Sequence, residues 1–150
     1  MSRKLKPEYE SDFYEWLMYS AKLLRGRKIN ELDFEHLAEE IESVGASEKR
    51  EIRNRLVVLI MHLLKWQFQA VRRSDSWRRT IIDQRDSIEL VLKDSPSLRP
   101  RLQQFIEEAY YPSAVHQAVE ETGMIESVFP KICPYTLEQI FDKHFYPGEA

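Results

Sequence analysis

The stretch that decides the fold runs from Glu48 to Arg73 and reads EKREIRNRLVVLIMHLLKWQFQAVRR. Neither glycine nor proline interrupts it. Its apolar residues form two stripes at helical spacing: Ile52, Leu56, Leu59, Leu63 and Trp66, and beside them Val57, Ile60, Met61, Leu64, Phe68 and Val71. A helix that is apolar around most of its circumference is buried. The run is too short and too interrupted to span a bilayer, which takes about 20 apolar residues. We therefore expect residues 48–73 to form the central buried helix of an all-helical protein.

Composition restricts the class of protein. The 150 residues are 43% hydrophobic and 31% charged, which is typical of a soluble globular domain. A net charge of −3 gives no general attraction to nucleic acid or to anionic membranes. The single cysteine, Cys133, excludes an internal disulfide framework, and no apolar run follows the basic N-terminus. These features favour a cytoplasmic protein without a signal peptide or transmembrane segment.

Capping residues mark further helices on both sides of the central stretch. Ser11 or Asp12 can cap a first helix that ends at Gly26, and Asn30 can cap a second that ends at Gly45. Thr136 and Gln139 form a capping box for the last helix. The expected helices cover residues 12–25, 31–44, 48–73, 75–93, 98–109, 115–122 and 137–145. No segment alternates apolar and polar residues long enough to predict a strand.

Short connections between these helices predict an antiparallel bundle of six to seven helices packed around the central one. At this length one domain is expected, and we assign it to residues 11–147. Residues 1–10 are polar, contain Pro7 and are expected to form a flexible N-terminal arm.

Several segments resemble an uncharacterised bacterial family, domain of unknown function twenty-nine. They are DFEHLAEEIESVG at residues 33–45, HLLKW at 62–66, WRRTIIDQR at 77–85, PSL at 96–98 and the Cys133–Pro134 step. The resemblance covers about residues 14–147 and implies an all-helical fold. It implies no reaction, cofactor or partner, so no functional residue is carried over from it.

A polar network is one candidate site. Arg85 lies within the apolar stripe of its helix, and a charge near a core must be paired. The helix at residues 31–44 carries acidic residues and no lysine or arginine, so we expect Glu40 to pair with Arg85, with His62 beside them. Such a network is compatible with an enzyme or metal protein. It is also compatible with a structural ion pair and a core histidine held by a hydrogen bond.

Metal binding has weak support, because only Asp33 and His36 form the acid-x-x-His pair that a bundle metal site would need twice. We expect no cofactor. No nucleophile motif, P-loop or dinucleotide fingerprint is present.

A basic turn is the second candidate site. It contains Lys65, Arg72, Arg73, Arg78 and Arg79. Trp66 and Trp77 flank the turn, and arginine beside aromatic rings can hold phosphate and stack bases. The alternative is that Arg72 and Arg73 complement a helix C-terminus while the tryptophans are core.

The lack of a complete catalytic set favours a non-enzymatic protein. The acidic and basic regions favour a module that binds a protein partner or a second copy of itself as a homodimer. Nucleic-acid binding through the basic turn and an enzyme using Glu40, His62 and Arg85 remain alternatives.

Overall fold

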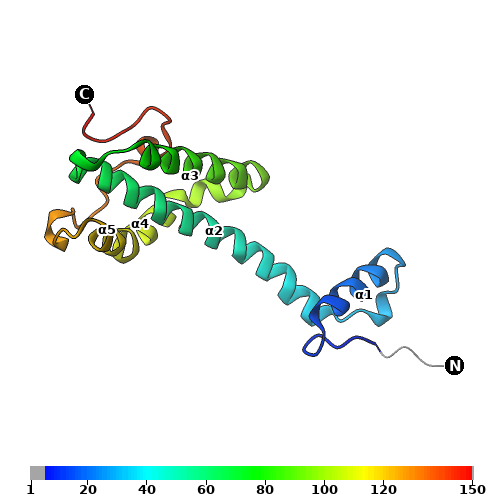
Figure 1. Cartoon of the computed structure of the whole chain (residues 1–150). Coiled ribbons are helices and arrows are strands. Elements are labelled where there is room, and N and C mark those ends of the chain that lie inside the picture. The colour runs from blue at the N-terminus through cyan, green and yellow to red at the C-terminus, as the bar shows by residue number, and fades with distance from the viewer. Residues whose placement is uncertain (1–5, 150) are drawn as a thin grey trace. The chain divides into compact units, whose positions relative to one another are not determined.

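A computed structural model describes residues 6–149, and no strand occurs among them (Figure 1). The α-helices are α1 (Phe13–Arg25), α2 (Phe34–Phe68), α3 (Asp75–Asp94), α4 (Leu102–Ala109), α5 (Val115–Thr122) and α6 (Leu137–Phe141). Short 3-10 turns at Ile29–Glu31, Ala70–Arg72, Pro96–Arg101 and Glu126–Val128 and a wide helical turn at Tyr110–Ala114 complete the chain. The predicted all-helical class is confirmed. No described helix is long and apolar enough to cross a membrane.

The largest error of the sequence prediction is the break that it placed at Gly45, within α2. Helix α2 joins the expected helices at residues 31–44 and 48–73 into one helix of 35 residues, with Gly45 and Ser47 inside it. A glycine in a helix interior costs only about 1 kcal/mol relative to alanine, and its neighbours Glu42, Ala46 and Glu48 are good or tolerable helix formers. Continuing the helix also keeps the backbone hydrogen bonds that a break would lose.

Other helix ends follow the capping residues closely. Asp12 accepts a hydrogen bond from the backbone N–H of Glu15, and Ser74 accepts one from Trp77. The capping box of Thr136 and Gln139 is formed as predicted. Asn30 was the wrong N-cap for the second helix: it lies in a 3-10 turn. Asp33 takes that role by accepting the backbone N–H of His36.

The predicted stop at Gly26 is confirmed, but Gly26 keeps a negative φ and Arg27 takes the left-handed conformation at φ +58°. Pro112 interrupts the chain between α4 and α5, as expected. Tyr111 leaves the helical conformation there, and the Tyr111–Pro112 peptide bond is cis. Gly123 ends α5 with φ +72°.

The chain divides into two compact units at the Ala46–Ser47 bond. We call residues up to 46 the N-terminal unit and residues from 47 the C-terminal unit. The single domain expected over residues 11–147 stays a prediction, since compactness alone does not say whether the units fold separately. Of the expected flexible arm, residues 1–5 lie outside the described residues, while Pro7 and Tyr9 are half-buried.

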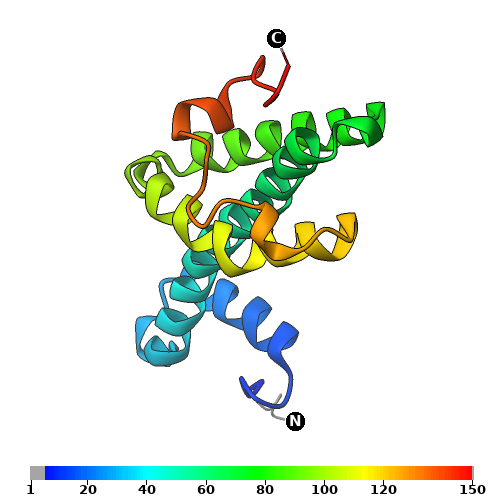
Figure 2. The same ribbon diagram turned by 90° about the vertical axis from the view of Figure 1, so that its left-hand side faces the viewer.

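The C-terminal unit contains the apolar core. α2 contributes Ile52, Leu56, Leu59 and Leu63, all fully buried, and α3 contributes Ile81 and Ile88. α4, α5 and α6 add buried residues such as Phe105, Ala118 and Ile140. Figure 2 shows the ribbon of these helices from a second side. Tyr135 joins the C-terminal loop to α2 by donating from its hydroxyl to the carbonyl of Leu63, at 3.1 Å, and to Gln67, at 2.8 Å. Residues 52–66 are thus a buried stretch of helix, as predicted, but α2 ends at Phe68 rather than at Arg73 and Val71 of the predicted stripe is 95% exposed.

Candidate functional site

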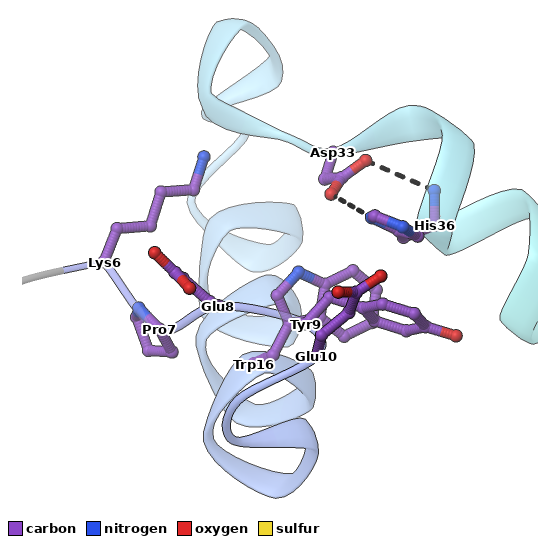
Figure 3. A pocket seen from close by; sticks show the side chains of 8 residues that line it. All are labelled: Lys6, Pro7, Glu8, Tyr9, Glu10, Trp16, Asp33 and His36. Carbon is purple, nitrogen blue, oxygen red and sulfur yellow. Dashed lines mark hydrogen bonds and ion pairs between the residues drawn. The ribbon is translucent and has the colours of Figure 1, made fainter.

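A polar and aromatic cluster lies where the N-terminal segment meets the first turn of α2 (Figure 3). It lines a hollow of about 390 Å³. The carboxylate of Asp33 caps α2 and also binds Nδ1 of His36 at 2.6 Å. The ring of Tyr9 stacks on the His36 ring, with centroids 4.0 Å apart, and Trp16 meets His36 edge-on at 6.2 Å.

The electrostatics of this cluster follow from its hydrogen bonds. The bond between Asp33 and His36 lowers the pKa of the Asp33 carboxyl and raises the pKa of His36. The hydroxyl of Tyr9 donates to Glu40, which raises the pKa of Tyr9 to about 12. The bond from Tyr9 to Glu40 joins the N-terminal segment to α2, and the bonds between Asp33 and His36 fix the first turn of α2. The cluster therefore holds this segment on α2, and the bond to Asp33 favours the charged form of His36.

The second feature of the N-terminal unit is an apolar surface that the unit leaves exposed. Only two large apolar side chains, Trp16 and Leu23, are buried among residues 6–46. The exposed large apolar residues of α1 and of the start of α2 are Phe13, Tyr14, Met18, Leu24, Phe34, Ile41 and Val44. Ile41 is 71% exposed and Val44 66%. On α2 the exposed residues recur at helical spacing, so they form one stripe.

The three residues expected to form a polar network have separate partners. Glu40 accepts the hydrogen bond from Tyr9. His62 binds the carbonyl oxygen of Val58 through Nδ1 at 2.8 Å, and its burial lowers its pKa. A half-buried neutral imidazole bonded to its own helix is the structural arrangement that we gave as the alternative. A functional role for Glu40, His62 or Arg85 stays a prediction.

Arg85 is buried, as its position in the stripe predicts, and its hydrogen bonds go to carbonyl oxygens rather than to a carboxylate. Its Nε donates to the carbonyl oxygen of Ile140 at 2.7 Å, and its Nη2 donates to the carbonyls of Gln139 at 3.4 Å and Phe145 at 2.9 Å. Burial lowers the pKa of the guanidinium. Three carbonyl oxygens in and after α6 thus accept hydrogen bonds from Nε and Nη2, while the buried Nη1 has no hydrogen-bond partner among the described residues. Arg85 therefore fixes the C-terminal segment to α3.

The five residues of the predicted basic turn do not form one exposed patch. Lys65 is buried, binds Glu121 and lies 4.4 Å from the ring centre of Trp77. Arg73 donates from Nε to the carbonyl of Trp66 at 2.8 Å.

Arg78, another residue of the predicted basic turn, contacts the C-terminal tail of the chain. Arg78 pairs with Glu149 at 3.2 Å and lies 4.3 Å from the ring centre of Tyr146. Only Arg72 and Arg79 of the five are exposed. Nucleic-acid binding by this turn stays a prediction, and it now depends on two side chains.

A further hollow, of about 510 Å³, lies in the C-terminal unit beside Tyr111, Val115 and Phe129. His116 binds Glu126 there through Nε2 at 3.2 Å, and a hydrogen bond to Glu126 raises the pKa of Tyr111. Within residues 6–149 no group of three or more His, Cys, Asp or Glu side chains is placed to hold a metal ion.

Sequence reasoning found part of the N-terminal cluster. The spacing of Asp33, His36 and Glu40 places them on one face of a helix. Tyr9 was missed, because it precedes the first helix in a polar segment with no periodicity. Its aromatic neighbours Phe13 and Trp16, four and seven residues later, were the available signal.

Comparison with known proteins identifies the family of the chain. No curated protein and no solved structure matches the chain. The model of the family described as Domain of unknown function DUF29 matches residues 8–146, and this range contains all the segments that carry the resemblance. The chain therefore belongs to the family Domain of unknown function DUF29.

Proposed function

We propose that this protein is a protein-interaction module whose N-terminal unit docks on a partner through its exposed apolar surface. The observation that carries the proposal is the set of seven exposed apolar side chains on α1 and the start of α2. Soluble proteins rarely expose contiguous apolar surface beyond a few hundred Å², and larger patches mark sites of association. We name this set the hairpin face.

The cluster of Tyr9, Asp33 and His36 supports the same function in a structural role. It fixes the segment before α1 on α2, within the N-terminal unit. A docking surface made of α1 and the start of α2 loses less entropy on binding when both helices are already held in place. The order of residues 6–12 thus prepares the hairpin face rather than forming a reaction centre.

The test compares two single substitutions on otherwise intact protein. Met18→Glu puts a charge into the hairpin face, while Leu90→Glu puts the same charge on an exposed apolar position of α3. Each protein is purified from its own host, and native mass spectrometry identifies what stays bound. We expect the unmodified protein and Leu90→Glu to retain a second polypeptide, either another copy or a different protein, and Met18→Glu to lose it. Equal retention by all three, or no retention by the unmodified protein, would contradict the proposal.

A further inference from the structure

The charges of α1 are separated along its axis. Asp12 and Glu15 lie at the N-terminal end of the helix, and Lys22 and Arg25 lie at its C-terminal end. All four are exposed. Among the described residues, no ion pair joins Lys22 or Arg25 to a carboxylate. The helix dipole accounts for the sign of the charge at each end, but these side chains keep their capacity to pair with another molecule.

The positions of these residues are symmetric about one point. Asp12 and Arg25 are equally far from the midpoint between Met18 and Tyr19. Glu15 and Lys22 are equally far from the same midpoint, and so are the apolar residues Phe13 and Leu24. A second α1 laid antiparallel about this midpoint would therefore place every acidic residue opposite a basic one. Glu15 and Lys22 lie three and four residues from the exposed Met18, so these three residues share one face of α1.

We propose that the partner of the hairpin face is a second copy of this chain, with the two α1 helices antiparallel about a twofold axis near Met18. This inference rests on the proposed function and names its partner. In such an interface the same patch of each copy meets itself. An arrangement that is acidic at one end, basic at the other and apolar between fits its own antiparallel copy and repels a parallel one.

The size of the hairpin face suits a dimer. Its seven side chains are each between 45% and 71% exposed. At roughly 150–250 Å² for a fully exposed aromatic side chain, Phe13, Tyr14 and Phe34 alone offer on the order of 300 Å² per copy, and the four aliphatic side chains add to this area. A stable specific interface buries about 800 Å² on each partner. The exposed stripe of α2, with Phe34 and Ile41, supplies part of this area beside α1.

The test of this pairing uses two variants with opposite defects, Glu15→Lys and Lys22→Glu. In a dimer of either variant, like charges meet at both ends of α1. In a mixed dimer, the new lysine of one copy would meet the new glutamate of the other at one end, and the original pair would meet at the other end. One variant is labelled with ¹⁵N so that native mass spectrometry separates mixed from unmixed dimers. Far-UV circular dichroism checks that both variants are folded.

The expected result is a dimer of the unmodified protein and a dissociation constant raised about tenfold or more for each variant alone at low salt. The equimolar mixture should form mixed dimers with near-normal affinity. Met18→Glu should be monomeric, because it places two carboxylates beside the twofold axis, while Leu90→Glu should remain dimeric.

Two results would overturn the inference. A mixture that dimerises no better than its components would exclude the antiparallel pairing of α1. An unmodified protein that stays monomeric up to high concentration would exclude self-association. In that second case, retention of a different protein that Met18→Glu loses would leave the proposed function intact. Retention of nothing would contradict both.

Discussion

The two units of this chain differ in how much of their apolar surface they bury. Every member of the buried apolar core lies at or after Ile52, and five helices of the C-terminal unit contribute to it. The N-terminal unit buries Trp16 and Leu23, yet exposes most of the other large apolar side chains of α1 and the start of α2. The C-terminal unit therefore has a core of its own, although it also exposes single apolar side chains such as Leu90, Ile125 and Ile132, while the N-terminal unit exposes most of its large apolar side chains.

The largest expected difference between the units comes from truncating one apolar residue in each. Leu59→Ala removes a fully buried side chain of the C-terminal core. It should lower the free energy of unfolding by roughly 2–5 kcal/mol, measured by urea denaturation. Ile41→Ala in dilute protein should change it by less than about 0.5 kcal/mol, because Ile41 is exposed. Similar losses at both positions would remove the contrast between the units.

Arg85 gives the next largest effect. Arg85→Met should destabilise the C-terminal unit by roughly 1–3 kcal/mol, because it leaves the buried carbonyls of Ile140 and Phe145 without a donor. The matched control is Arg79→Met on the same helix, where the side chain is exposed and a change within about 0.5 kcal/mol is expected. Equal stability of the two variants would mean that the three carbonyl bonds contribute nothing.

Substitution of Gly45 tests whether α2 is a continuous helix in its exposed part. Gly45→Ala should raise the free energy of unfolding by about 0.5–1 kcal/mol and increase helicity, because an added Cβ meets nothing within 4 Å. Gly123→Ala is the opposite control: its φ of +72° makes the substitution destabilising. A loss of stability in Gly45→Ala would indicate that the helix is broken there in solution.

The smallest expected effect is on the pH dependence of stability. It is followed through one histidine of each unit, His36 and His62. Because the pKa of His36 is raised above 6.5 in the folded protein, its pairing with Asp33 adds stability that is complete below pH 6.5. That stability is lost as the pH rises through the raised pKa. Asp33, with its pKa lowered from 3.8, contributes above pH 3.8 and loses its contribution as the pH falls through the lowered value.

NMR titration of the ring protons checks both histidines. His36 should titrate above pH 6.5 and His62 below it, since burial lowers the pKa of His62. Asp33→Asn should bring the pKa of His36 down while leaving His62 unchanged. Titration of the two rings at the same pH would contradict the assigned hydrogen bonds.

The sequence predicted what depends on local periodicity and capping. The apolar stripes from Ile52 to Trp66 and the capping box at Thr136 are both seen in the structure. Gly45 misled the prediction, because glycine ends helices often but is tolerated inside one at a small cost. Nothing in the neighbouring sequence distinguishes these two outcomes.

The partners of polar residues could not be predicted in the same way. Burial of Arg85 followed from its place in an apolar stripe, but carbonyl groups, which every residue carries, took the place of the expected carboxylate. Phe34, Ile41 and Val44 recur at helical spacing on α2, and the structure leaves all three exposed. Helical spacing shows that residues share a face; it does not show whether anything covers that face.

Hydrogen–deuterium exchange at several protein concentrations tests the central claim most directly. If the hairpin face needs a partner, amides of α1 and of residues 34–46 should become more protected as concentration rises, while amides of residues 52–66 should not change. Met18→Glu should hold the N-terminal unit at its dilute level of protection. Protection of α1 that is independent of concentration and identical in Met18→Glu would contradict the claim.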